Sequence, residues 1–168
     1  MAGDHDEYGR IPKVIAGFAV SHGAAAGYIE DTSCQECHQE IYDDYQAVGM
    51  SQSFYPPSED KIVEPLEATF HHQLTGRYYQ MSFRNGKLYQ ERYQLDEQGR
   101  RFAQYEAEVA WIIGSGNHVR SYLSHSPHGE LFQLPLSWYA ESGWGMSPGY
   151  DRSKHFGFER RVSRHCMF

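Results

Sequence analysis

The sequence predicts an α+β fold in which one N-terminal helix precedes an antiparallel β-meander. Residues 34–48 carry apolar positions at helical spacing, whereas much of the chain between about residue 67 and residue 140 alternates between apolar and polar side chains. An Asn-Gly pair, a strong hairpin signal, lies between two of the alternating segments. The chain has 168 residues, which fits a single domain, and we expect this domain over residues 31–168. We expect residues 1–30 to form an arm before it.

The N-terminal 30 residues show no sustained periodicity and are expected to form a flexible arm. Within the arm, residues 13–27 contain a short apolar stretch and a small-residue end that loosely resemble a secretion signal. The residues before this stretch are acidic where a leader is basic, so the leader signal is weak. No apolar run approaches the roughly 20 residues that cross a bilayer, so no transmembrane segment is expected.

A helix is expected over residues 34–48. Its apolar residues fall on one side: Ile41, Tyr42, Tyr45 and Val48. Thr32 or Ser33 is suited to cap its start, and Gly49 is a natural stop signal. The loop that follows contains Pro56-Pro57, which excludes further helix.

The β-rich part is expected over about residues 67–140. Asn85-Gly86 predicts a hairpin between residues 77–84 and residues 87–95. The first of these strands would present its alternate apolar residues on one face: Tyr79, Met81 and Phe83. After a turn at residues 96–100, a third strand is expected from Phe102 to Ile113.

A further hairpin is expected around the turn at residues 127–130, between "RSYLSHS" and "LFQLPLSWYA". The segment after Gly143 is rich in Gly, Pro and aromatic residues. We expect it to wrap the sheet as irregular structure.

The chain is acidic, with 22 Asp and Glu against 15 Lys and Arg and a formal net charge of −7. No run of basic residues occurs, so nucleic acid is excluded as an expected partner. An acidic surface suits docking to a basic patch on another protein.

Two of the three cysteines lie two residues apart, and a histidine follows the second: Cys34, Cys37 and His38. Cys-x-x-Cys-His is the attachment signature of c-type haem, in which each thiol adds to a vinyl group and the histidine binds the iron. The short helix that the motif opens is the expected context. We therefore expect one complete site for covalent haem c.

Zinc, a redox dithiol and chance are alternatives to haem for these three residues. A zinc site would need a second ligand pair, for which His71-His72 or Cys166 with His165 is available without a standard spacing. A redox dithiol would need a βαβ context that does not follow Cys37. Chance could produce so short a motif, but the adjacent histidine would then have no function.

The stretch "YIEDTSCQECHQEIYDDYQAVGMSQSFY" resembles the opening of bacterial multihaem c-type cytochromes, some of which are fused to tetratricopeptide repeats. The resemblance continues through "GRYYQMSFRNGKLYQERYQL", "VAWIIGSGNHVRSYL", "LPLSWYAESG" and "MSPGYDRSKHFGFERRVSRHCMF". It covers roughly residues 28–168, and "GSGNHVRSYL" and "MSPGYDR" are its more specific parts. The resemblance implies a periplasmic or exported electron carrier whose partner is a redox protein or other haem domains.

The resemblance has one departure. In the family, a stretch like "CMF" is followed at once by Cys-His, which makes a second haem motif. This chain ends at Cys166-Met167-Phe168 and so looks cut one step short of that motif, as a fragment of a larger multihaem protein or a truncated reading frame would be. Cys166 alone cannot hold haem through two thioethers, so a free thiol is expected there.

An electron-transfer haem needs a second axial ligand opposite His38. His118, which follows a flexible Gly-Ser-Gly approach and lies in a resemblance block, is the first candidate, with His72 next and Met50 as a further alternative. A helix running from His38 to Met50 would separate the two by about 18 Å, so Met50 needs a chain reversal near Gly49.

Function depends on this sixth ligand. An electron carrier needs no catalytic residue. An open sixth position would instead allow a haem enzyme of the peroxidase or nitrogen-oxide type, an alternative supported by Arg120 beside His118. A zinc-stabilised binding module is the second alternative.

Overall fold

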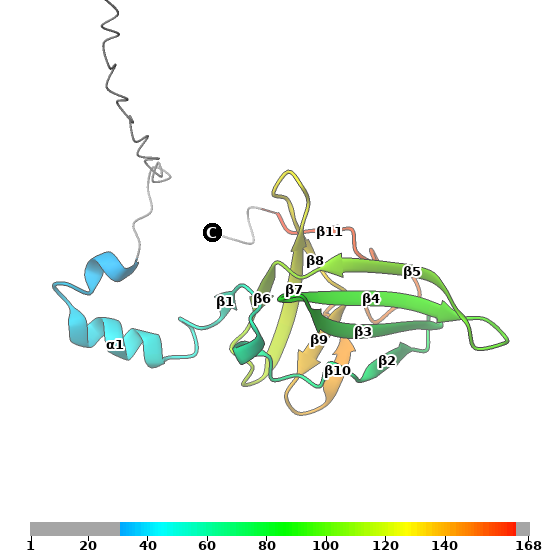
Figure 1. Cartoon of the computed structure of the whole chain (residues 1–168), viewed down its shortest axis with the longest axis horizontal. Coiled ribbons are helices and arrows are strands. Elements are labelled where there is room, and N and C mark those ends of the chain that lie inside the picture. The colour runs from blue at the N-terminus through cyan, green and yellow to red at the C-terminus, as the bar shows by residue number, and fades with distance from the viewer. Residues whose placement is uncertain (1–30, 164–168) are drawn as a thin grey trace, which may run out of the picture.

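The computed structural model describes residues 31–163, in which two antiparallel sheets form nearly all of the folded part (Figure 1). The described residues form eleven strands, one α-helix and two short 3₁₀ helices. The predicted α+β class is wrong: the fold is mostly β, with 41% strand and 11% helix. The helix was expected to be a structural element of the domain, yet it buries none of its residues and adds no layer to the core.

The smaller sheet has four strands in the order β2-β3-β4-β5. Their bounds are β2 Thr69–His72, β3 Arg77–Arg84, β4 Lys87–Leu95 and β5 Arg101–Glu108. The Asn85-Gly86 hairpin is confirmed, with φ of 52° and 75°, because a type I′ turn needs two residues of positive φ. The turn after β4 is also confirmed, since the Asp96 N–H donates to the Arg100 carbonyl at 3.0 Å.

The larger sheet has seven strands, five of them in the order β1-β6-β7-β8-β11. β9 pairs with both β7 and β10. The bounds are β1 Phe54–Tyr55, β6 Trp111–Ile113, β7 Val119–His125, β8 Leu131–Gln133, β9 Leu136–Tyr139, β10 Gly143–Met146 and β11 Arg160–Arg161. The hairpin expected around residues 127–130 is confirmed as β7–β8, but its expected second arm, "LFQLPLSWYA", is two strands, β8 and β9, rather than one.

Two predictions for the β-rich part are wrong in detail. The strand expected from Phe102 to Ile113 is two strands, because β5 ends at Glu108 in one sheet and β6 begins at Trp111 in the other. Between them the N–H of Val109 still bonds to β4, while the N–H of Ala110 already bonds to β7. The segment after Gly143 also begins with a regular strand, β10, rather than irregular structure.

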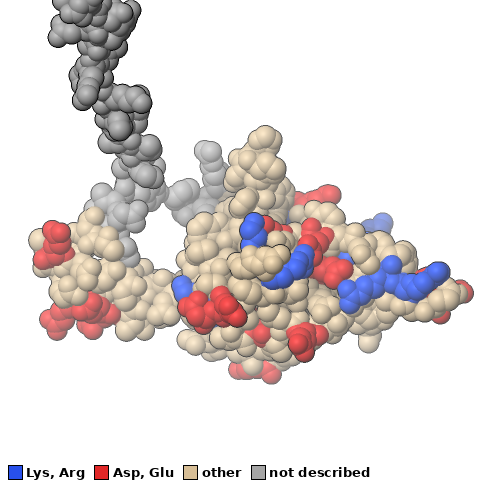
Figure 2. All heavy atoms as spheres, in the orientation of Figure 1, with Lys and Arg blue, Asp and Glu red and all other residues tan. Residues whose placement is uncertain are grey.

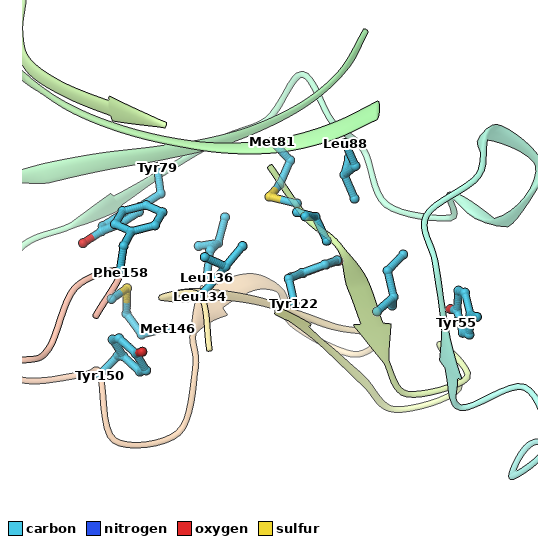
Figure 3. Packing of buried hydrophobic residues seen from close by; sticks show 12 residues of the cluster. Tyr55, Tyr79, Met81, Leu88, Tyr122, Leu134, Leu136, Met146, Tyr150 and Phe158 are labelled. Atoms are coloured by element: carbon cyan, nitrogen blue, oxygen red, sulfur yellow. The ribbon is translucent and has the colours of Figure 1, made fainter. Parts of the chain in front are cut away.

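The core lies between the two sheets (Figure 3). Tyr79 and Met81 of β3 point inward and Phe83 packs against the same cluster, so the predicted face is confirmed. The buried residues come from both sheets and from the C-terminal segment: Tyr55, Tyr79, Met81, Leu88, Val109, Ile112, Tyr122, Leu134, Leu136, Met146, Tyr150 and Phe158. Direct packing of tyrosines therefore supplies much of the core.

The helix α1 (Gln39–Ala47) projects from the sandwich and is preceded by a 3₁₀ turn, η1 (Asp31–Cys34). A second 3₁₀ turn, η2, covers Glu59–Lys61. The helix begins five residues later than expected, and His38 rather than Thr32 or Ser33 occupies its N-cap position. It ends just before Gly49, as predicted.

Several expectations lie outside the described residues, namely the arm with its weak leader and the C-terminal residues His165 and Cys166. Within residues 31–163 no helix is long and apolar enough to cross a membrane.

Candidate functional site

The Cys-x-x-Cys-His motif forms one tight turn of chain. The carbonyl of Cys34 accepts hydrogen bonds from the N–H of Cys37 at 3.3 Å and from the N–H of His38 at 3.0 Å. The second bond joins residues four apart, as in one turn of α-helix. Both thiols are free and exposed, so both are available for covalent attachment.

An apolar groove of about 340 Å³ runs along the helix from this turn. Its lining residues recur at helical spacing: Cys34, His38, Ile41, Tyr42 and Tyr45. The groove therefore has a thiol and an imidazole at one end and apolar side chains along the rest. This combination suits a flat, largely apolar ligand with an atom that an imidazole can bind.

The apolar side of α1 has no partner in the described protein. Ile41 is 68% exposed, Tyr45 47% and Val48 48%. Acidic residues of the same helix, including Asp43 and Asp44, gather on its surface at the left of Figure 2. Exposed apolar surface rimmed by charge is typical of a binding site rather than of a free helix.

Two chemistries are compared for the donors beside the groove, a covalently held porphyrin and zinc. Two thiols and one imidazole match the requirement for two thioethers and one iron ligand. A structural zinc site needs four ligands, and residues 31–163 contain no cluster of three or more His, Cys, Asp or Glu side chains placed to hold a metal ion. The pair His71-His72 lies on β2, in the sandwich, and His165 with Cys166 falls outside the described residues.

The structure does not bring His118 to His38. His118 is exposed in the loop between β6 and β7, and its carbonyl accepts the N–H of Ala140 at 2.8 Å. The loop before it meets the chain just beyond the helix, where Ser115 Oγ lies 3.4 Å from the position that a Cβ on Gly49 would take. His38 is at the other end of a nine-residue helix, about 14 Å long.

The other two axial candidates are not at the groove either. His72 is only 3% exposed and faces the interior, with Nδ1 2.9 Å from Thr75 Oγ1 and Nε2 3.2 Å from Asp151 Oδ1. Both of its nitrogens are therefore engaged. Met50 is 78% exposed and lies past the end of the helix that is remote from His38. The structure brings together Cys34, Cys37 and His38, but none of the three distal candidates.

Arg120 is part of the interior rather than of an open site. Its Nη1 donates to Glu64 Oε1 at 3.2 Å and to the Lys61 carbonyl at 2.7 Å, and its Nη2 donates to the Ser115 carbonyl at 3.0 Å. The guanidinium is thus held in place and is not free to act on a ligand beside His118. Sequence reasoning did not identify Glu64 as the partner of Arg120. A signal was present, since "IVEPL" places Glu64 alone among apolar residues.

Sequence reasoning also missed a second polar cluster, which contains Arg77, Arg92 and His155. One signal for it was present. The alternation that puts Tyr79 and Met81 on the inner face of β3 puts Arg77 on that face as well, and Arg92 pairs directly with Tyr79. An arginine at an inward-facing position of a strand is unusual, and it indicates polar groups or a ligand around the guanidinium.

Comparison with protein-family models, curated proteins and solved structures returns no match to this chain. Its function is therefore inferred from the motif, the groove and the exposed helix face.

Proposed function

We propose that the chain is a c-type cytochrome domain that binds covalent haem c on the exposed face of α1 and transfers electrons. The observation that supports this most directly is the apolar groove that begins at Cys34 and His38 and follows the unpartnered side of the helix. A large apolar ligand there would cover Ile41 and Tyr45, which are otherwise exposed to water.

Each residue of the motif has a separate role in this proposal. Cys34 and Cys37 would tether the porphyrin through thioethers, and His38 would bind the iron. Ile41, Tyr42 and Tyr45 would pack against the ring and exclude water from one of its faces. The haem would supply a one-electron redox couple, so no catalytic residue of the chain is required.

None of the three candidate sixth ligands lines the groove beside His38. His118 and Met50 reach the groove only if the chain beyond Val48 takes another path, and His72 would first have to leave the core. A ligand from another haem domain would meet the same need without rearrangement. A partner is expected in any case, because electron transfer requires a redox protein or a neighbouring haem.

Attachment of haem c takes place outside the cytoplasm, so the proposal implies a periplasmic or exported protein. The exposed acidic side chains of α1, among them Asp43 and Asp44, are suited to a partner with a basic docking surface.

The proposal is tested by expressing the chain with a haem-maturation system and recording its denatured mass and its oxidised and reduced optical spectra. One covalently added haem with sharp reduced bands is expected. Cys34→Ala and Cys37→Ala should each lose one thioether, and the double variant should lose the haem altogether, whereas Cys166→Ala is the matched control and should keep it. A colourless wild-type protein at the mass of the polypeptide would overturn the proposal.

The same spectra decide between electron transfer and catalysis. A weak near-infrared band in the oxidised protein indicates methionine as the sixth ligand, and its absence in a six-coordinate spectrum indicates two histidines. A five-coordinate spectrum would favour the haem enzyme over the electron carrier. Stoichiometric zinc in a colourless protein would favour the binding module.

A further inference from the structure

A second pocket, of about 230 Å³, lies between strands β3, β4 and β5 of the smaller sheet and residues 155–159. Its charged and titratable lining residues are Arg77, Arg92, Tyr105, His155 and Glu159. Arg77 pairs in register with the buried His72, and Arg92 pairs with the buried Tyr79. Both arginines therefore start from inward-facing positions of their strands.

The two arginines have no carboxylate partner among the ion pairs of residues 31–163. Arg92 instead lies 5.8 Å from the ring centres of Tyr105 and Phe158. Glu159 is the one acidic residue in the lining, and Asp151 nearby is already paired with His72. Arginines elsewhere on the smaller sheet do have such partners, since Arg84 pairs with Glu106 and Arg101 pairs with Glu91.

Two buried polar atoms at the end of the core that borders this pocket make no hydrogen bond of normal geometry among the described residues: Tyr79 Oη, although Arg77 is close enough to interact with it, and His155 Nε2. Tyr79 is fully buried, and Figure 3 places it at the same end of the core as Phe158, which lines the pocket. His155 directs its other nitrogen, Nδ1, to the N–H of Gly157 at 3.0 Å. Buried polar groups almost always have a partner, so unpaired ones beside a pocket indicate where a ligand or water binds.

The electrostatic field at the pocket is positive. The pKa of His155 is lowered, first by burial and then by the charges of the neighbouring Arg77, Arg92 and Arg152. The pKa of the Tyr79 hydroxyl is raised by burial, while Arg77 and Arg92 act in the opposite direction. This concentration of positive charge contrasts with a chain whose net charge is −7.

We propose that this pocket binds a small oxyanion between Arg77, Arg92 and His155. Planar guanidinium groups bind carboxylate and phosphate oxygens through paired hydrogen bonds, and an anion would compensate two arginines that lack a carboxylate. Tyr79 is not a lining residue of the pocket, but its buried hydroxyl interacts with Arg77 and Arg92, so it can donate to the ligand through water. Anion binding here does not depend on the haem proposal. The pocket is formed by strands of the smaller sheet and residues 155–159, whereas the Cys34–His38 turn precedes α1.

The test uses inorganic phosphate as the probe and the full chain as the protein. Calorimetric titration and thermal unfolding are recorded with phosphate and, at matched ionic strength, with chloride. Saturable binding of phosphate and a rise in Tm that chloride does not reproduce are expected. Arg77→Gln and Arg92→Gln should each weaken binding by tenfold or more, whereas Arg101→Gln, an arginine on the outer face of the same sheet, should leave it unchanged.

A titration with acetate in place of phosphate distinguishes the two ligand chemistries, because a site for a tetrahedral dianion will prefer phosphate and a carboxylate site will not. Should either arginine variant fail to fold, amide and guanidinium NMR shifts of the wild-type protein replace it. Shift changes confined to Arg77, Arg92 and residues 155–159 support the site. No saturable binding, equal binding by all variants, or shift changes located elsewhere would overturn the proposal.

Discussion

The hydroxyl of Tyr122 donates a hydrogen bond to Oε1 of Glu64 at 2.6 Å, inside the core and between residues 58 positions apart in the chain. The same carboxylate accepts from Arg120 Nη1 at 3.2 and 3.3 Å and from the Val63 N–H at 3.0 Å. One acidic side chain therefore holds the segment between β1 and β2 against strand β7, which carries both Arg120 and Tyr122.

Removal of the Glu64 charge is expected to destabilise the protein strongly. Glu64→Gln keeps the shape but leaves the Arg120 guanidinium buried without a counter-charge, a situation that costs about 3–5 kcal/mol. The measurement is urea unfolding at pH 7. Glu108→Gln, which breaks the exposed pair with Lys87, is the control and should cost far less, because water screens that pair. Equal losses in the two variants would contradict the structural role of the buried pair.

The protein is expected to lose stability as the pH rises above 10. Burial is the main cause that raises the pKa of Tyr55, Tyr79, Tyr122 and Tyr150 in the folded protein. In the unfolded chain these hydroxyls ionise near pH 10. The folded state thus binds more protons than the unfolded state above that value, and alkali favours unfolding.

A spectrophotometric titration of tyrosine, run beside far-UV circular dichroism, checks this expectation. The exposed hydroxyls should ionise reversibly, and the buried ones should ionise only together with loss of the β signal. Tyr122→Phe should show a shallower loss of stability above pH 10 than the wild type, while Tyr45→Phe on the exposed helix should not. Full ionisation of all tyrosines with the fold intact would contradict this expectation.

Acid is expected to weaken the fold through His155. Because the folded-state pKa of this imidazole is lowered from 6.5, the unfolded chain binds its proton first. Stability should therefore fall as the pH drops from about 6.5 towards the folded-state value. His155→Asn, whose Oδ1 can still accept the Gly157 N–H, should reduce this slope in urea unfolding from pH 7.5 to 5 in phosphate-free buffer. His128→Asn at an exposed turn is the control, and an unchanged slope in His155→Asn would rule this source out.

Two glycines with positive φ should differ in their response to substitution by alanine. Gly86 has a φ of 75° and open space around the missing side chain, so Gly86→Ala should cost only the left-handed backbone penalty of about 1–2 kcal/mol. Gly114 has a φ of 106°, and a Cβ there would overlap the carbonyl oxygen of Val119. Gly114→Ala should therefore cost more than Gly86→Ala in chemical unfolding, and similar values would show that the loop before β7 relaxes freely.

Local signals predicted the hairpins of this protein well. Asn85-Gly86 specifies its own turn, and the alternation of Tyr79 and Met81 specifies an inner face, because both depend on residues close in the chain. The passage from one sheet to the other at Val109-Ala110 depends on partners more than ten residues away on β4 and β7. Alternation continues across such a junction and cannot reveal it.

For the helix and the site, too, local sequence signals did not reveal contacts with distant parts of the chain. Periodicity identified the apolar side of α1 but carried no information on whether the sandwich would cover it, and the structure leaves it exposed. Adjacency in sequence sufficed to group Cys34, Cys37 and His38. The distal candidates could not be ranked in this way, because their distance from His38 depends on the path of the whole chain.

The helix α1 contributes nothing to the core, so the sandwich can fold to completion before any group is attached to Cys34 and Cys37. A helix of nine residues is marginal by itself in water. Under the haem proposal, assembly would then take place in two stages, with the enzyme that attaches the haem acting on an already folded domain. The ordering of the helix, unlike that of the sheets, would report whether maturation has taken place.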